Sequence, residues 1–154
     1  MNIDELKRIN RELMERADMV YLSTIHSDGF PRIRVMLNLR NKIQFPSLVP
    51  LFKTHCTDYC IYFTTNTSSN KIREISANPN VSVYFSDTKT FHGLMLLGQI
   101  EIISDESLKK QFWQKGWEMY YPLGVTDPDY SILRVYPFLA KGWYNTDHFQ
   151  FELL

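Results

Sequence analysis

The sequence predicts a mainly β fold, an antiparallel barrel of short strands with helices at its periphery. Five to seven short segments are rich in β-branched and aromatic residues or alternate apolar with polar ones. Turn residues separate these segments, and the helical stretches interrupt the strands without alternating regularly with them. A doubly wound parallel sheet needs that regular alternation, so the pattern favours the barrel.

Length and composition predict one domain over residues 1–154. Of the 154 residues, 44% are hydrophobic, enough for a chain of this size to bury about two-thirds of its unfolded surface. Basic and acidic residues number 17 each, so no global positive field attracts nucleic acid or an anionic membrane. The N-terminus is polar and no apolar run approaches the roughly 20 residues of a membrane span. We expect a soluble, cytoplasmic protein.

The cysteines and histidines indicate no metal centre. Cys56 and Cys60 are too few for a disulfide framework, and the four histidines lack the paired spacing of zinc ligands. We expect reduced thiols, with a redox or metal pair as the less favoured alternative.

The chain begins with an expected helix and hairpin. Residues 3–16 have apolar side chains at helical spacing, and Asn2 with Glu5 can cap the helix start. Residues 19–25 and 31–39 form a hairpin around an Asp-Gly turn. Within the second strand the side chains alternate. One face carries Ile33, Val35, Leu37 and Leu39, and the other carries Arg32, Arg34, Met36 and Asn38.

Later elements follow the same signals. Residues 44–58 have two prolines and no clear period, which predicts an irregular excursion. A helix at 69–77 and a second one at 104–121, capped by Ser104, are expected. Gly98 is a candidate bulge, and Pro137 separates two strands. The strands are expected at 58–65, 81–86, 94–103, 131–136, 140–144 and 149–153.

The segment 62–72 is the one stretch that resembles a ligand site. A buried-type strand runs into hydroxyl and amide residues, and Lys71 then opens a short helix. Unpaired N–H groups at a helix start, small hydroxyls and an amine together suit a phosphate. The alternatives are an ordinary exposed Lys71 and an Arg34 that only pairs with a cross-strand carboxylate.

The order of four blocks resembles the flavin mononucleotide (FMN)-binding split-barrel family, which includes pyridoxamine 5′-phosphate oxidase. The likeness spans roughly residues 18–115, and Pro122, Gly124, Asp127, Pro128 and Trp143 extend it. The blocks are Ser23 to Arg32, Ile61 to Thr65 followed by Ser69 to Lys71, Asn78 to Phe85, and Leu97 to Ile102.

The resemblance implies an antiparallel split β-barrel and a homodimer with two FMN molecules in clefts formed by both subunits. By position, Arg34 and Lys71 correspond to the cationic phosphate contacts, with Thr65 and Ser69 as hydroxyl donors. The implied cofactor-binding residues are Arg34, Val35, Met36, Leu37, Phe63, Thr64, Thr65, Ser69, Asn70, Lys71 and Trp143. Trp113 and Trp117 are expected in packing or at the dimer interface.

The chain also departs from the family pattern. Leu39 and residues 145–148 stand where oxidases of pyridoxamine phosphate carry a lysine and an Arg-x-His, so vitamin B6 oxidation is not expected. Asn70 replaces a frequent arginine, and Gly93 replaces a glutamine that reads the flavin ring.

The expected function is therefore an FMN-dependent oxidoreductase acting on an unidentified small molecule. The flavin supplies the redox chemistry, so no catalytic side chain is assigned. The electron donor would be a nicotinamide cofactor or another flavoprotein. The alternative is a non-catalytic flavin- or haem-binding protein, in which His92 or His148 would be the haem ligand.

Overall fold

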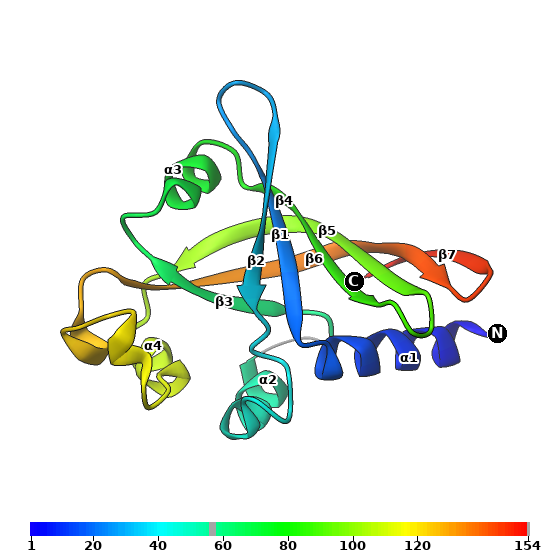
Figure 1. Cartoon of the computed structure of the whole chain (residues 1–154), viewed down its shortest axis with the longest axis horizontal. Helices are drawn as coiled ribbons and strands as arrows, with labels where there is room; N and C mark the ends of the chain where they lie inside the picture. Colours follow the sequence, from blue (N-terminus) through cyan, green and yellow to red (C-terminus); the bar gives the residue numbers. More distant parts are fainter. Residues whose placement is uncertain (56–57, 154) are drawn as a thin grey trace.

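The computed structural model describes residues 1–55 and 58–153, and its centre is an antiparallel seven-stranded sheet (Figure 1). Its strands are β1 (Met19–Ile25), β2 (Pro31–Leu37), β3 (Ile61–Asn66), β4 (Asn80–Asp87), β5 (His92–Ile103), β6 (Tyr130–Tyr144) and β7 (Asp147–Glu152). The helices are α1 (Ile3–Arg16), α2 (Val49–His55), α3 (Asn70–Ala77) and α4 (Glu106–Phe112). Short 3₁₀ turns are η1 (Pro46–Leu48), η2 (Trp117–Met119) and η3 (Gly124–Thr126).

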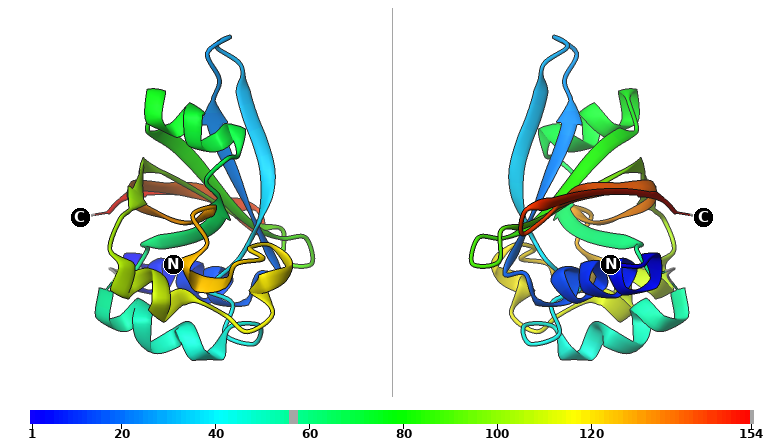
Figure 2. Two further views of the ribbon diagram at one scale, coloured as in Figure 1. Left: turned by 90° about the vertical axis from the view of Figure 1, so that its left-hand side faces the viewer. Right: turned by 90° about the vertical axis from the view of Figure 1, so that its right-hand side faces the viewer.

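The strand order confirms the mainly β split-barrel prediction. The hydrogen-bonded path runs β2-β1-β4-β5-β6-β3, with β7 paired to β6, and the sheet does not close between its end strands β2 and β3. Figure 2 shows the β1–β2 hairpin rising from the curved sheet with α3 beside it. The phosphate-site candidates on β2 and α3 are therefore neighbours in space.

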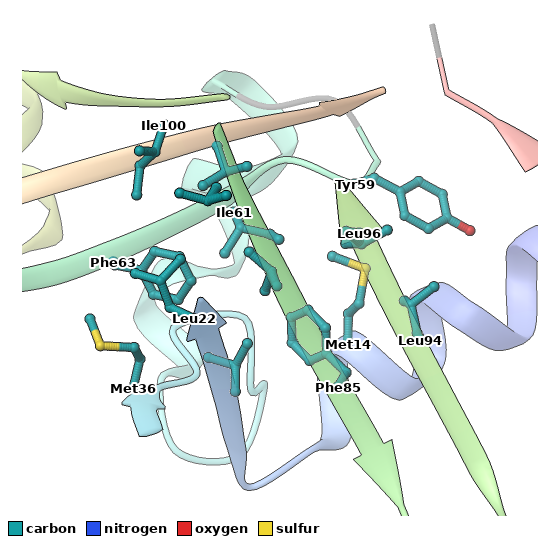
Figure 3. Packing of buried hydrophobic residues seen from close by; sticks show 14 of the residues in the cluster. Met14, Leu22, Met36, Tyr59, Ile61, Phe63, Phe85, Leu94, Leu96 and Ile100 are labelled. Carbon is teal, nitrogen blue, oxygen red and sulfur yellow. The ribbon is translucent and has the colours of Figure 1, made fainter. Parts of the chain in front are cut away.

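Two hydrophobic clusters hold the fold together. The larger one lies inside the curved sheet, where Leu22, Phe63, Phe85 and Leu96 meet Met14 of α1 (Figure 3). Each of these side chains is fully buried, which stabilises by roughly 1.5–3 kcal/mol per side chain. The second cluster packs α2 and α4 against β3 and β6 and is rich in aromatic rings.

The first helix and the hairpin are confirmed. The Asn2 side chain accepts a hydrogen bond from the Glu5 N–H, as a capping residue does. On β2 the arginine face turns toward α3 and the core, and the apolar face turns outward. Ile33 and Val35 are 70% and 52% exposed. This outward apolar face has no covering element within the described chain.

Three sequence predictions of local structure are wrong. Residues 44–58 include α2, because Leu48 and Phe52 are buried in the second cluster. The helix at 104–121 is only α4, capped by Asp105 and not by Ser104. Gly116, at φ +96°, breaks the chain into separate turns, so the tryptophans do not share one helix.

The third error concerns Pro137, which does not divide two strands. β6 runs unbroken through it, because the ladder with β5 shifts register at Leu97/Gly98. A Cβ at Gly98 would lie 2.7 Å from the Tyr136 carbonyl oxygen, so the bulge needs glycine. The predicted bulge at Gly98 is thus confirmed, and it accommodates a proline that has no N–H to donate.

The cysteine expectation also changes. Cys60 is buried and disulfide-bonded, which contradicts the prediction of reduced thiols at that residue. Cys56 lies outside the described residues.

Among the described residues, no helix has both the length and the apolarity to cross a membrane.

Candidate functional site

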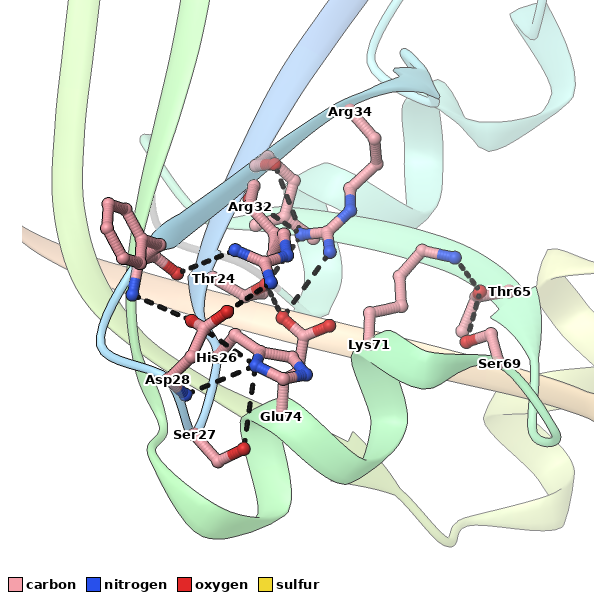
Figure 4. Close-up of polar contacts among 12 residues, drawn as sticks. Thr24, His26, Ser27, Asp28, Arg32, Arg34, Thr65, Ser69, Lys71 and Glu74 are labelled. Carbon is pink, nitrogen blue, oxygen red and sulfur yellow. Dashed lines mark hydrogen bonds and ion pairs between the residues drawn. The ribbon is translucent and has the colours of Figure 1, made fainter.

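Arg34 and Lys71 approach one another from two separate elements. Arg34 lies on β2 and Lys71 in the first turn of α3; Figure 4 shows the guanidinium turned toward Thr24 and Glu74 and the Lys71 amine turned toward Thr65. Arg34 Nη1 donates to Thr24 Oγ1 at 2.7 Å and to the Arg32 carbonyl at 3.1 Å. These bonds fix the guanidinium over the strand.

A buried carboxylate partly balances this arginine. Glu74 Oε2 lies 3.6 Å from Arg34 Nη2 and accepts a 2.6 Å hydrogen bond from Thr24 Oγ1. The carboxylate comes from α3, so the cross-strand partner expected as an alternative is replaced by a helix partner. Counting Arg34, Lys71 and Glu74, the cluster retains one positive charge.

Lys71 is the less satisfied cation of the two. Its Nζ donates to Thr65 Oγ1 at 2.9 Å, and the Thr65 and Ser69 hydroxyls lie 3.5 Å apart. No carboxylate of the described residues lies within 4.0 Å of its Nζ. Burial lowers the pKa of Lys71, and the nearby Arg34 charge lowers it further, while Glu74 opposes both. An anion at this position would raise the pKa of Lys71 again, because a neighbouring negative charge favours the charged ammonium.

The start of α3 adds backbone donors to the cluster. Ser69 is the N-cap residue, and its hydroxyl makes no capping bond to the helix. The N–H groups of the first turn and the positive end of the helix dipole are thus available to an anion. Arg34, Thr65, Ser69 and Lys71 are the predicted residues that the fold brings together.

Sequence reasoning missed the residue that anchors this loop. The Asp129 carboxylate accepts from Asn66 Nδ2 at 2.6 Å and from the Ser68 N–H at 2.8 Å, and its carbonyl accepts from the Thr67 N–H at 2.8 Å. These bonds lower the pKa of Asp129, the Asn66 bond most. The segment 66–68 is thereby fixed just before Ser69. Its only sequence signal was the preceding Asp127-Pro128 pair.

The remaining predicted residues from β2 and β3 do not place side chains in the cluster. Val35 lies on the outer face, Met36 and Phe63 are buried in the core, and Leu37 packs against the second cluster. Of these four residues, only the backbone groups can therefore contact a ligand near Arg34. Thr64 Oγ1 lies 2.5 Å from the Tyr121 hydroxyl, a tyrosine that was not among the predicted site residues.

The side chains of Asn70 and Trp143 take no part in the cluster, for different reasons. The exposed Asn70 side chain accepts a 3.1 Å bond from Arg73. Trp143, 50% exposed, stands twelve residues beyond Ser131 on β6, and Ser131 is the strand partner of Thr65. At about 3.3 Å per residue the strand covers roughly 40 Å between them. The end of β6 beside β7, which carries Trp143, and α3, which carries Lys71, therefore lie toward opposite ends of the sheet (Figure 1).

The departure at Gly93 has a physical reason. A Cβ on Gly93 would lie 2.0 Å from the Tyr84 hydroxyl, so the tyrosine side chain occupies the space of any larger residue there. Tyr84, Phe91 and Trp143 line a small pocket around this glycine. A glutamine would fit only if Tyr84 moved.

The two haem-ligand candidates differ. His92 is buried, and its Nε2 lies 2.8 Å from Asn10 Oδ1, so that nitrogen is already engaged. Burial lowers the pKa of His92 to about 4. His148 is exposed, with its ring centroid 5.6 Å from that of Trp143. Within the described residues, no group of three or more His, Cys, Asp or Glu side chains could hold a metal ion.

Comparison with known proteins agrees with this architecture. The chain is similar to a Clostridium acetobutylicum protein related to general stress protein 26 of B. subtilis, of the pyridoxinephosphate oxidase family, at 29% identity. That match covers 99% of this chain and 97% of the other, with a TM-score of 0.79. General stress protein 26 from Bacillus anthracis str. Sterne matches at 23% identity, 97% and 99% coverage and a TM-score of 0.72. An F420 reductase shares the fold at 24% identity, 84% and 94% coverage and a TM-score of 0.55.

The search of curated proteins finds no match. The comparison with protein families does find a match. Residues 6–144 match the pyridoxamine 5′-phosphate oxidase family, a stretch that includes β1 to β6 and the whole Arg34–Lys71 cluster. Because this match covers most of the chain, the protein belongs to the pyridoxamine 5′-phosphate oxidase family.

Proposed function

We propose that the protein binds FMN, with the flavin phosphate between Arg34 and Lys71. The observation that carries this proposal is that two cations from separate elements lie near one another, and one of them has no carboxylate within 4.0 Å in the described chain. A phosphate dianion suits this set, because charge-assisted hydrogen bonds are about twice as strong as neutral ones.

Each residue has a distinct task in this proposal. Lys71 and Arg34 supply charge, and Ser69 supplies a hydroxyl together with the first N–H groups of α3. Thr65 accepts its bond from Lys71, so its hydroxyl proton can be donated either to Ser69 or to the phosphate. Glu74 holds Arg34 in place, and its carboxylate also places one negative charge near the ligand.

We further propose a homodimer that forms through the outer face of the sheet. Val35 pairs with Tyr21, and Tyr21 pairs with Tyr84, so exposed apolar and aromatic side chains form a continuous row across three strands. Contiguous apolar surface of this kind marks interaction sites. A second copy is also the way for a Trp143 side chain to approach a flavin held at Lys71, because the two residues of one protomer lie far apart.

The proposed activity is an FMN-dependent oxidoreduction of a small molecule. Bound flavin supplies the electron transfer, and the protein positions the cofactor and leaves one ring face accessible. Among the described residues, no histidine or cysteine forms a hydrogen bond or ion pair with Arg34, Lys71 or Glu74, and we assign proton transfer to no side chain. Oxidation of pyridoxamine phosphate is not proposed, because Leu39 is buried where the substrate lysine would stand.

The first test compares FMN with riboflavin, which lacks the phosphate. Purified protein is titrated with each ligand by flavin fluorescence, for the wild type, Lys71→Gln and a matched control, Lys115→Gln, at an exposed lysine outside the cluster. We expect Lys71→Gln to weaken FMN by at least about tenfold and to leave riboflavin unchanged. Equal binding of FMN by the wild type and Lys71→Gln would refute the phosphate assignment.

Turnover requires a second experiment. The FMN-loaded protein is reduced anaerobically and then mixed with small-molecule acceptors while the flavin absorbance is followed. Reoxidation faster than that of free reduced FMN supports the enzyme. Reoxidation at the free-flavin rate with every acceptor favours a flavin carrier that performs no turnover.

A further inference from the structure

A cavity with a mainly basic lining lies beside α1 and α2, which are on the lower side of the molecule in Figure 1. It has a volume of about 280 Å³ and shares no lining residue with the Arg34–Lys71 cluster. Its charged lining residues are Arg11, Arg40, Lys42, Lys53, Glu15 and Asp58.

Two of the four cations in this cavity are already paired. Lys42 Nζ lies 2.7 Å from Glu15 Oε2, and Arg11 Nη1 lies 3.3 Å from Asp58 Oδ2. Arg40 and Lys53 have no carboxylate within 4.0 Å among the described residues. Four positive and two negative side chains leave the cavity with a surplus of two positive charges.

Arg40 is fixed in a way that leaves donors open to the cavity. Its Nη1 donates to the Cys60 carbonyl at 2.7 Å, and its guanidinium carbon lies 5.0 Å from the centroid of the Phe52 ring. No buried side-chain nitrogen or oxygen of the described residues lacks a hydrogen-bond partner, so the other Arg40 N–H groups are not sealed inside the protein. A rigid guanidinium with free donors suits a carboxylate or phosphate.

We propose that this cavity binds a small organic dianion, such as a phosphate monoester or a dicarboxylate. Arg40 supplies a planar fork for two anionic oxygens, and Lys53 supplies the second unpaired charge. Val49 and Phe52 form an apolar wall for the carbon skeleton of the ligand. The ligand's two negative charges match the surplus.

The proposal is separable from the FMN site because the test uses Lys71→Gln protein, in which the other anion site is weakened, and because the two sites share no lining residue. Inorganic phosphate and succinate are titrated into this protein by isothermal calorimetry and by ¹H–¹⁵N NMR, at constant ionic strength. We expect saturable binding with a Kd of about 1 mM or tighter and amide shifts at Arg40, Lys42 and Lys53. The stronger of the two probes identifies the headgroup class.

Two variants in the same background locate the site. Lys53→Gln removes an exposed charge and should weaken the bound probe by about tenfold, and Arg40→Gln by more. Lys115→Gln is the matched control and should have no effect. Because Arg40 also contacts the core, Lys53→Gln decides the matter if Arg40→Gln fails to fold. Absence of saturable binding, or equal binding by the Lys53→Gln and Lys115→Gln proteins, overturns the proposal.

Discussion

The Glu74 carboxylate lies 3.6 Å from the Arg34 guanidinium, inside the cluster that we assign to a phosphate. Glu74 is buried and also accepts a hydrogen bond from Thr24. The same carboxylate thus orients the arginine and reduces the positive charge that a phosphate would meet. Loss of the carboxylate should therefore lower the stability of the fold and raise the affinity for a phosphate.

Replacing Glu74 with glutamine should separate the two roles. We expect Glu74→Gln to lower the free energy of unfolding by about 1–3 kcal/mol, because a buried charge-assisted bond is lost. FMN affinity should rise at the same time, since one negative charge near the phosphate disappears. Urea unfolding and FMN titration of the same preparation measure both. Unchanged stability with weaker FMN binding would contradict this assignment.

Asp129 provides a complementary test, because its charge and its geometry predict opposite results. Simple electrostatics predicts that Asp129→Asn strengthens FMN binding by removing a negative charge near the loop at residues 66–68. Positioning predicts weaker binding, since the bonds to Asn66 and Ser68 hold the loop before Ser69. We expect weaker FMN binding by about tenfold and unchanged riboflavin binding. Tighter FMN binding by Asp129→Asn would show that Asp129 acts only as a charge.

His92 should make the fold sensitive to acid. Its pKa is lowered to about 4 in the folded protein, mainly by burial and also by the nearby Arg16 charge, with Asp87 opposing. The unfolded value is 6.5, so the unfolded chain binds more protons between these values. Stability is therefore fully present above pH 6.5 and decreases as the pH falls toward 4, by up to about 3 kcal/mol.

This pH dependence can be assigned with one variant. Urea unfolding of the wild type and His92→Gln is measured at several pH values between 7 and about 4. The wild type should lose stability across this window, and His92→Gln should lose less. Parallel curves for the two proteins would mean that another group is responsible.

The outer face of the sheet predicts the effect of a charge on assembly. Val35→Asp introduces a carboxylate into the exposed apolar row, and Ile43→Asp introduces one at a residue that is 88% exposed outside it. Light scattering should find a dimer for the wild type and Ile43→Asp and a monomer for Val35→Asp. A wild-type monomer, or a Val35→Asp dimer, would contradict the proposed interface.

Local sequence signals were sufficient where one element determines its own structure. Asn2 with Glu5 identified the start of α1, and Gly98 identified the bulge, because caps and bulges depend on neighbouring residues. Local chemistry also indicated the segment that contains Lys71 as a candidate site. Family resemblance added its pairing with Arg34, which local patterns do not reveal.

The errors arose where distant contacts decide the outcome. Phe52 of α2 and Leu48 of the preceding turn η1 pack into the second cluster, and this packing stabilises α2, which the proline-containing segment does not indicate by itself. Pro137 stays within β6 because the ladder with β5 shifts register next to it, with Phe138 of β6 as the extra residue of the bulge. Asp129 hydrogen-bonds to the loop at residues 66–68, more than sixty positions away in the sequence, so only the fold identifies it.

A crystal structure of the protein with FMN is the most direct test of the central claim. We predict a phosphate oxygen within about 3 Å of Lys71 Nζ and another beside the Arg34 guanidinium. We also predict that Ser69 and the first turn of α3 donate to the same phosphate. A flavin whose phosphate lies elsewhere, with Lys71 still bonded only to Thr65, would show that the phosphate assignment is wrong.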